Sequence, residues 1–443
     1  MPTTTYNFPR GFLWGTATSS HQVEGNNKNN NFWAWEQEPG KIAYKHKSGL
    51  ACDWWGGRWK EDFDRIVETG QNAHRFSIEW SRIQPTPDRW NEDALEHYRQ
   101  MLQRLAEHQI TPLVTLHHFC DPLWISELGG WENEAIVDYF AAFVSKAVPA
   151  LSEYCNIWVT INEPNVLAAY AYMFGLFPPG KKKLRLFSQV HFNLVKAHAA
   201  AYNIIHKLQP TARVGIATNY RSARPSQSWN PLDRIMVALV YSVFNDAVPQ
   251  ALQNGVFRLP WSRKRIPEAK NTQDFLGLNY YTRDIVAFSF RKSNEAFMQT
   301  YFPPNAELST TGFIANEPDG MFEALKWGLR FNLPIIVTEN GIEDKDDVVR
   351  PSYLVQHLHQ VWRAVNFNWP VKGYFHWSLI DNFEWERGWT QRFGLWGLDI
   401  ETQARYRRPS VDLFATICKE NGISSDMVRQ YAPMAFERLF PGE

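Results

Sequence analysis

Short apolar runs alternate with amphipathic stretches along most of this 443-residue chain. The runs are rich in β-branched residues and have the length of buried parallel strands, whereas the stretches between them have the apolar spacing of helices. We expect strands at 12–16, 73–78, 112–116, 157–161, 213–218, 275–280, 335–338 and 373–377. Helices are expected at 93–108, 134–151, 187–208, 321–331 and 353–366, among others. Eight strand–helix units predict an α/β fold, a (β/α)8 TIM barrel, rather than an open doubly wound sheet.

The chain is predicted to form one domain, residues 1–443. No Pro/Ser-rich linker and no repeat of fixed period interrupts the sequence. No glycine-rich phosphate-binding turn follows the first expected strand, which argues against a dinucleotide-binding fold. The Asn-rich segment 26–31 and the segment 289–317 are expected to be long loops. Loops of that length in a compact domain usually carry function, and in a barrel they would form the active-site rim.

The charge balance argues against nucleic acid or an anionic membrane as a partner. Lys plus Arg equals Asp plus Glu at 46 each, so the formal net charge is zero. A neutral chain has no global field that favours a polyanion. The basic cluster Lys181-Lys182-Lys183 is expected to lie in a solvated loop. The longest apolar stretch, around 235–243, is interrupted and is predicted to be too short to span a bilayer.

Cysteine usage and the first residues favour a cytoplasmic protein. The four cysteines, at positions 52, 120, 155 and 418, form no CxxC pair and no metal-type spacing, so reduced thiols are expected. Residues 1–10 lack the apolar core of a signal peptide. The sequence implies no metal and no organic cofactor, and it leaves the oligomeric state open.

Two glutamates stand where catalytic groups are expected in a barrel. Glu163 ends the run Trp158-Val159-Thr160-Ile161-Asn162, and Glu339 ends the run Ile335-Ile336-Val337-Thr338. A chain-breaking Pro or Gly follows soon after each one. The carboxyl end of a barrel strand is the usual place for catalytic side chains. Two carboxylates from different strands are the requirement for hydrolysis of a glycosidic bond.

Nearly every expected strand delivers a hydrogen-bonding or aromatic group to the same rim. Because the carboxyl ends of barrel strands meet at one face, these groups should converge. They are His21, Gln22 and Glu24 after the first strand, Arg75 on the second, His117 and His118 on the third, Asn162 and Glu163 on the fourth, Asn279, Tyr280 and Tyr281 on the sixth, Glu339 and Asn340 on the seventh, and Trp377, Asn382, Phe383, Glu384 and Trp385 on and after the eighth.

The chemistry of acetal cleavage assigns a role to each glutamate. Glu163 is predicted to be the general acid, with a pKa raised by partial burial and by the second carboxylate. Glu339 is predicted to be the ionised nucleophile, with Arg75 and the hydroxyl of Tyr281 as its partners. A carboxyl separation of about 5–5.5 Å would give retention of anomeric configuration, and about 6.5–9.5 Å would give inversion.

Adjacent residues on a strand point in opposite directions, which constrains two pairs. His117 and His118 therefore cannot easily share one metal ion, and we expect His117 to pack outside the barrel while His118 faces the substrate. Of Tyr280 and Tyr281, only one should face the pocket.

With these residues in view, the chain resembles glycoside hydrolase family 1, the β-glucosidase-like enzymes, over nearly its whole length. The motifs that carry the resemblance are Thr160-Ile161-Asn162-Glu163-Pro164, Val337-Thr338-Glu339-Asn340-Gly341 and Trp377-Ser378-Leu379-Ile380-Asp381-Asn382-Phe383-Glu384-Trp385. Phe12-Leu13-Trp14-Gly15, Gln22-Val23-Glu24-Gly25 and Arg392-Phe393-Gly394-Leu395 match the family as well.

The resemblance implies a retaining, exo-acting β-glycosidase of the β-glucosidase type that acts on a small β-glycoside or oligosaccharide. It implies that Glu163 is the acid/base and Glu339 the nucleophile, with support from Asn279 and Tyr281. By the same resemblance, the glycone is bound through hydrogen bonds and stacking by Gln22, His118, Asn162, Trp377, Glu384 and Trp385.

Three features depart from the family pattern, and one is the absence, in the loop Gly312-Phe313-Ile314-Ala315-Asn316, of a tryptophan that often lines the leaving-group site, which leaves the aglycone preference open. Phe119 stands where many members have a tryptophan whose N–H reaches a sugar hydroxyl, so we expect weaker selectivity at the 3-hydroxyl. Glu386 adds a carboxylate beside Glu384 and Trp385 to which the sequence assigns no role.

Four alternatives stand beside the β-glucosidase interpretation. A 6-phospho-β-glycosidase is disfavoured because Glu384 would repel a phosphate dianion. A catalytically inactive sugar-binding barrel is disfavoured because both carboxylates are present. Transfer to sugars or alcohols instead of water uses the same covalent intermediate, and β-galactosidase or β-fucosidase activity also remains open.

Overall fold

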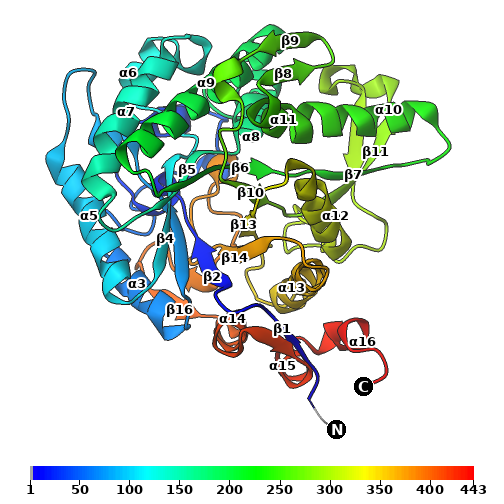
Figure 1. Ribbon diagram of the computed structural model, residues 1–443. Coiled ribbons are helices and arrows are strands. Elements are labelled where there is room, and N and C mark those ends of the chain that lie inside the picture. The colour runs from blue at the N-terminus through cyan, green and yellow to red at the C-terminus, as the bar shows by residue number, and fades with distance from the viewer. Residues whose placement is uncertain (1–2) are drawn as a thin grey trace.

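The computed structural model describes residues 3–443, and eight parallel strands at its centre close into a barrel (Figure 1). The barrel order is β10-β13-β14-β2-β3-β4-β5-β6, so the first and last barrel strands in the sequence, β2 and β14, are neighbours. The strands are β2 (Leu13–Ala17), β3 (Ala73–Ser77), β4 (Thr111–His117), β5 (Ile157–Asn162), β6 (Arg213–Asn219), β10 (Phe275–Asn279), β13 (Ile335–Asn340) and β14 (Val371–Trp377). The predicted (β/α)8 barrel is confirmed, and each strand lies within two residues of its expected bounds.

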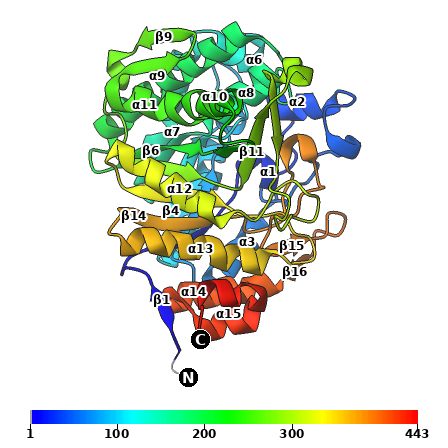
Figure 2. The same ribbon diagram turned by 90° about the vertical axis from the view of Figure 1, so that its right-hand side faces the viewer.

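A ring of helices covers the outside of the barrel, as Figures 1 and 2 show from two directions. The main ones are α3 (Trp59–Glu68), α5 (Glu92–Glu107), α7 (Ile136–Leu151), α9 (Leu184–Leu208), α10 (Pro231–Leu239), α11 (Ala247–Asn254), α12 (Pro318–Gly328), α13 (Arg350–Asn366) and α14 (Pro409–Glu420). The five helices expected from the sequence all form, with bounds that differ by up to three residues.

Shorter elements lie in the loops and at the two ends of the chain. The short strands are β1 (Thr5–Asn7), β7 (Ser222–Pro225), β8 (Val256–Leu259), β9 (Ser262–Arg265), β11 (Arg283–Phe288), β12 (Met298–Tyr301), β15 (Trp396–Leu398), β16 (Arg405–Arg407) and β17 (Gly422–Ser424). The short helices are α1 (Ser20–Val23), α2 (Asn31–Gln37), α4 (Trp80–Ile83), α6 (Leu123–Glu127), α8 (Pro164–Ala169), α15 (Ser425–Tyr431) and α16 (Phe436–Leu439). β1 pairs antiparallel with β17, and both views place β1 close to the C-terminal helices.

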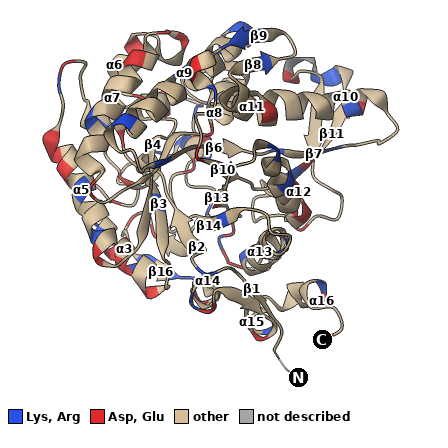
Figure 3. Ribbon diagram, in the orientation of Figure 1, with Lys and Arg blue, Asp and Glu red and all other residues tan. Residues whose placement is uncertain are grey.

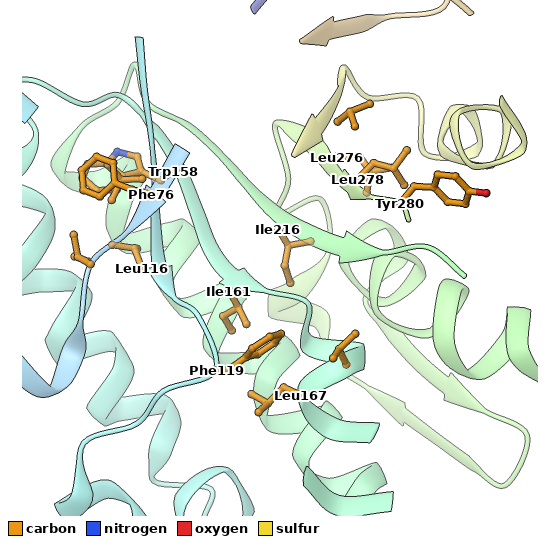
Figure 4. Close-up of a cluster of buried hydrophobic side chains, with 14 of the residues drawn as sticks. Phe76, Leu116, Phe119, Trp158, Ile161, Leu167, Ile216, Leu276, Leu278 and Tyr280 are labelled. Atoms are coloured by element: carbon orange, nitrogen blue, oxygen red, sulfur yellow. The ribbon is translucent and has the colours of Figure 1, made fainter. Parts of the chain in front are cut away.

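The core has two layers because side chains alternate along each strand. On β10, Phe275 belongs to the small cluster inside the barrel, while Leu276 and Leu278 belong to the large cluster between the strands and the helices. Figure 4 shows Leu276, Leu278 and Tyr280 in this outer layer. The same alternation separates the tyrosine pair: Tyr280 donates to the carbonyl of Glu317, and Tyr281 lines a cavity at the rim. The expectation that one of the two faces the pocket is confirmed.

One of the two segments expected to be long loops contains regular structure. Within 289–317, β12 pairs antiparallel with β11 and a 3-10 helix spans Phe290–Glu295. In the Asn-rich segment, Asn30 caps helix α2 by accepting from the backbone N–H of Trp33 at 2.8 Å. The loop expectation was therefore wrong for part of 289–317, because short strands leave little periodic signal in a sequence, whereas 26–30 form the expected loop that leads into α2.

The apolar stretch around 235–243 is part of a longer helical run than the sequence indicated. A π-helical segment, Val240–Asp246, joins α10 to α11. Pro231–Asn254 is, by length and composition, the one helix in the described residues that could cross a membrane, and 44% of its most apolar window is buried in the protein. Within this run, α10 packs on β7 and β11 and α11 packs on α9, so part of its apolar surface is buried in the fold, while Leu232 and Ile235 are exposed.

In Figure 3, the ribbon colours show positions of basic and acidic residues interspersed over the helices and loops. On α5, for example, Arg99 pairs with Glu153 at 2.6 Å, and on α3 Asp64 pairs with Arg104 at 2.6 Å. Exposed pairs of this kind add little stability, about 0.2–1 kcal/mol each. The surface pattern therefore agrees with the zero net charge of the sequence.

Candidate active site

A cavity of about 680 Å³ opens at the carboxyl ends of the barrel strands. Its floor holds Glu163 and Glu339, and the walls come from loops that follow most of the strands. Of the remaining residues predicted for the site, His118, Tyr281, Trp377, Glu384 and Trp385 line the cavity. These side chains, which follow different strands in the sequence, therefore converge at one rim, as expected.

Glu163 lies at the tip of β5, where the backbone adopts a left-handed conformation, φ 44° and ψ 59°, before Pro164 begins α8. Its Oε1 accepts hydrogen bonds of 2.8 Å from the side-chain amides of Asn279 and Asn219. No described residue donates to its Oε2. Burial, followed by the negative charge of Glu339, raises the pKa of Glu163 to about 8. Glu163 is therefore protonated at neutral pH and can donate that proton.

Glu339, near the end of β13, has a cationic partner. Arg75 Nη1 donates to Glu339 Oε1 at 2.6 Å, and the hydroxyl of Tyr281 donates to Oε2 at 2.5 Å. Burial raises the pKa of Glu339, and the Arg75 charge, the Tyr281 hydroxyl and the Asn279 amide oppose that rise. Of the two carboxylates, Glu339 is therefore the one that holds the negative charge.

Arg75 is 1% exposed and ties the two strand ends together. Besides Glu339, its guanidinium donates to Asn162 Oδ1 at 2.6 Å and to the Thr338 carbonyl at 3.1 Å. Removing one member of such a buried pair leaves an uncompensated charge, which costs about 3–5 kcal/mol. Asn279 acts on both carboxyl groups: its amide donates to Glu163 Oε1 at 2.8 Å, and the same side chain opposes the rise in the pKa of Glu339.

One side of the cavity presents groups suited to a sugar ring. His118 and Trp377 stack with ring centroids 6.1 Å apart, and His118 and Trp385 stack at 5.9 Å. Burial, together with the charge of Arg75, keeps the pKa of His118 well below its usual value, so the ring is neutral. His118 Nε2 accepts from the amide of Asn162 at 2.9 Å, while Nδ1 has no partner in the part of the chain that the structure describes. That nitrogen is available to a ligand hydroxyl.

Gln22 and Asn162 lie behind the cavity wall. Both are fully buried and neither lines the cavity. Gln22 Nε2 donates to Asn382 Oδ1 at 2.8 Å and to Glu384 Oε2 at 3.0 Å. The structure thus shows these two amides holding other site residues in place, and their direct contact with a sugar stays a prediction.

Sequence reasoning missed Asn219, the second amide on Glu163. It ends β6, so its place at the carboxyl end of a barrel strand was a usable signal. Glu386 also lines the cavity, and its charge adds to burial in raising the pKa of Glu384 to about 8. Arg221 and Asp284 form an ion pair at the cavity wall, which no local sequence pattern indicated.

The neighbouring residues on β4 occupy the places expected for them. His117 points away from the cavity, where its Nε2 lies 2.9 Å from Asp121 and its ring packs edge-on against Trp131. Phe119 lines the cavity and packs edge-on against Trp385 at 5.1 Å. This wall therefore offers a hydrocarbon ring where an indole would offer a donor.

Comparison with known proteins identifies relatives over almost the whole chain. Residues 4–423 match the model of glycosyl hydrolase family 1. A 1,4-β-D-glucan glucohydrolase of Thermotoga neapolitana is 33% identical over 94% of this chain and 99% of its own length. A β-galactosidase of Sulfolobus acidocaldarius is 31% identical over 95% of this chain and 97% of its own length. Among solved structures, a β-glycosidase from Pyrococcus horikoshii superposes with a TM-score of 0.90 at 36% identity, covering 97% of this chain and 98% of that one.

Proposed function

The chain belongs to glycosyl hydrolase family 1 and is a β-glycosidase, and we propose that it releases glucose from the non-reducing end of small β-glucosides with retention of configuration. The observation that carries this proposal is the unequal pair of buried carboxylates on the cavity floor. Glu163, with a pKa of about 8, is an acid at neutral pH, and Glu339 is held ionised by Arg75 and Tyr281.

In the first step, Glu339 attacks the anomeric carbon of the bound glycoside while Glu163 protonates the departing oxygen. The carbon–oxygen bond to the aglycone breaks, and a covalent glycosyl ester of Glu339 forms. In the second step, the ionised Glu163 removes a proton from water, which attacks the same carbon and releases the sugar and Glu339. The Glu163 Oε2 atom, to which no described residue donates, is the oxygen placed for both proton transfers.

The cavity charge supports a neutral glycone. Glu384 and Glu386 both line the wall; a carboxyl group that is ionised there repels a phosphate or carboxylate substituent, and a protonated one supplies no countercharge for it. Galactose is the second glycone that we propose, because the relative from Sulfolobus acidocaldarius is named a β-galactosidase.

A panel of p-nitrophenyl glycosides tests the proposal. It comprises the β-glucoside, β-galactoside, β-fucoside, β-mannoside and β-glucoside 6-phosphate, with the α-glucoside as the anomeric control. Release from the β-glucoside should be fastest, and proton NMR of the first product should show the β-anomer. Cleavage of the phosphorylated sugar alone would overturn the neutral-glycone argument, and the α-anomer as first product would overturn retention.

We also propose that the enzyme works in the cytoplasm as a soluble catalyst with no nucleic-acid partner. All four cysteines are buried and unpaired, which suits a reducing compartment. Fractionation of cells that express the chain should recover the glucosidase activity in the cytosol, and recovery in the medium or the membrane pellet would contradict this.

A further inference from the structure

Tyr44 is an aromatic residue at the cavity that the catalytic reaction does not use. It belongs to a short 3-10 helix, Ala43–Lys45, in the loop that follows α2, and it lines the cavity although 83% of its surface is exposed. An exposed single aromatic ring is common on protein surfaces. An exposed ring that also forms part of a ligand cavity has a face available to whatever enters.

The backbone of Tyr44 is strained, with φ 52° and ψ 18° in the left-handed region, and Lys45 follows with φ 59°. A bulky residue adopts this conformation rarely. Within the described residues, the Tyr44 hydroxyl makes no hydrogen bond, and the nearest aromatic partner of its ring is His46 at 5.7 Å. The folded chain therefore gains little from this side chain, and strain without an internal benefit is typical of residues that serve a ligand.

The strained segment is fixed to the turn that carries the sugar-binding residues. Trp389 donates from its backbone N–H to His46 Nδ1 at 3.0 Å and from its indole to the Lys47 carbonyl at 2.9 Å. In the same turn, the Glu384 N–H donates to the Gly388 carbonyl at 2.7 Å. Tyr44 thus has a defined position relative to Glu384, as a binding platform requires.

A second aromatic residue on the same cavity is less suited to the role. The guanidinium of Arg387 lies 4.8 Å from the centroid of the Phe313 ring and covers one face of it. No described cation lies over Tyr44. Glu386, Arg387 and Gln391 line the same cavity with groups that can donate to or accept from hydroxyls. An open ring face in a cavity that also presents polar groups matches a pyranose, which has apolar C–H faces and a hydroxylated edge.

We propose that Tyr44 is a stacking platform for the second sugar of the leaving group, so that short β-linked oligosaccharides are better substrates than disaccharides. This inference rests on the proposed β-glucosidase function and names its substrate class more closely. The released glucose then lies on the cavity floor beside the two carboxyl groups. The second sugar of the leaving group, which is the third ring from the non-reducing end, lies at the cavity mouth on Tyr44.

The test compares kcat/KM for p-nitrophenyl β-glucoside, cellobiose, cellotriose and cellotetraose. The wild-type enzyme should cleave cellotriose more efficiently than cellobiose. Tyr44→Ala should remove that gain, a loss of about fivefold to tenfold on cellotriose, and should leave p-nitrophenyl β-glucoside and cellobiose within about twofold. Tyr44→Phe keeps the ring face and should keep the gain. Trp229→Ala is the matched control, because Trp229 is 77% exposed and does not line the cavity.

The outcomes separate this inference from the proposed function. No cleavage of p-nitrophenyl β-glucoside by the wild type would overturn the function itself. Cleavage with equal efficiency on cellobiose and cellotriose, or an equal loss on all substrates in Tyr44→Ala, would overturn the platform alone. Tyr44→Gly adds a second measurement: it should lose the gain on cellotriose while its Tm stays equal or rises, because glycine accepts φ 52° without strain. A lower Tm would show that the ring serves the fold and would overturn the inference.

Discussion

The ends of β5 and β13 each present one buried glutamate, and the groups around the two differ. At the end of β13, Glu339 accepts from a guanidinium and a phenol. At the end of β5, Glu163 accepts from two neutral amides, those of Asn279 and Asn219. Burial raises the pKa of both carboxyl groups, so burial alone cannot determine which one is the acid and which one is the nucleophile.

The difference shows that the neighbours decide which group keeps the proton. A cation within hydrogen-bond distance stabilises the ionised form directly, whereas an amide supplies a dipole and no net charge. The charge on Glu339 then acts on Glu163 and holds its pKa up. At neutral pH, Glu163 is therefore the protonated acid of the pair and Glu339 is the ionised nucleophile.

The largest expected effect is the loss of the charged member. Glu339→Gly should lower kcat by roughly 10⁵-fold or more, because no other carboxylate stands ready to form the covalent intermediate. Added azide should enter the space and restore cleavage, with the α-glycosyl azide as product, measurable by NMR. Ordinary activity in this variant would show that Glu339 is not the nucleophile.

Loss of the neutral member should depend on the leaving group. Glu163→Ala should slow alkyl β-glucosides by about 10²- to 10⁴-fold, because the alkoxide then departs without a proton. A 2,4-dinitrophenyl β-glucoside needs little protonation, so its first step should change far less. A series of aryl glucosides of graded leaving-group pKa measures this, and an equal loss across the series would remove Glu163 from the acid role.

Tyr281→Phe removes one donor from the charged side. Hydrogen bonds to charged groups contribute about 1.5–3 kcal/mol, so kcat/KM should fall about 10- to 100-fold. A donor stabilises the ionised carboxylate, so its loss raises the pKa of Glu339. Because Glu339 must be ionised to attack, the acidic limb of the pH profile should move to higher pH. Tyr280→Phe is the matched control, since that hydroxyl donates to the Glu317 carbonyl outside the cavity; a shift in both variants would contradict the assignment.

The smallest expected effect lies on the neutral side. Asn219→Ala removes one amide from Glu163 and should raise its pKa further, by up to about one unit. Because Glu163 must be protonated to act as the acid, the basic limb should move upward from about pH 8. The limb that moves thus identifies which carboxylate lost a donor. A downward shift of the basic limb would mean that another group titrates there.

The barrel and the members of its floor could be predicted from the sequence because they obey local rules. Runs such as Ile335-Ile336-Val337 mark buried strands, and the alternation along a strand separates Tyr281 from Tyr280 and His118 from His117. The polar residue at a strand's carboxyl end is a position that the barrel topology places at the rim. Asn219 also stands at the carboxyl end of a barrel strand, β6, but no recognisable motif surrounds it in the sequence.

The mouth of the cavity could not be predicted, because its geometry comes from contacts between distant loops. The bond from Trp389 to His46 joins residues 343 apart in the chain, and the ion pair of Arg221 with Asp284 joins two loops. Nor does a sequence show that Tyr44 has left-handed backbone angles. Such features depend on how loops pack once the barrel has closed.

Because β2 and β14 are neighbours in the barrel, the barrel cannot close during synthesis until β14 has left the ribosome. Gln22 bonds to Asn382, which is 360 residues away, and at ~5–20 residues per second synthesis of that interval takes roughly 20 to 70 s. A nascent chain that ends between Asn340 and Val371 contains both catalytic carboxylates but lacks β14, so its barrel is still open between β13 and β2. Activity should begin only after β14 docks, so the onset of activity depends on translation of the last barrel strand and not of the catalytic residues alone.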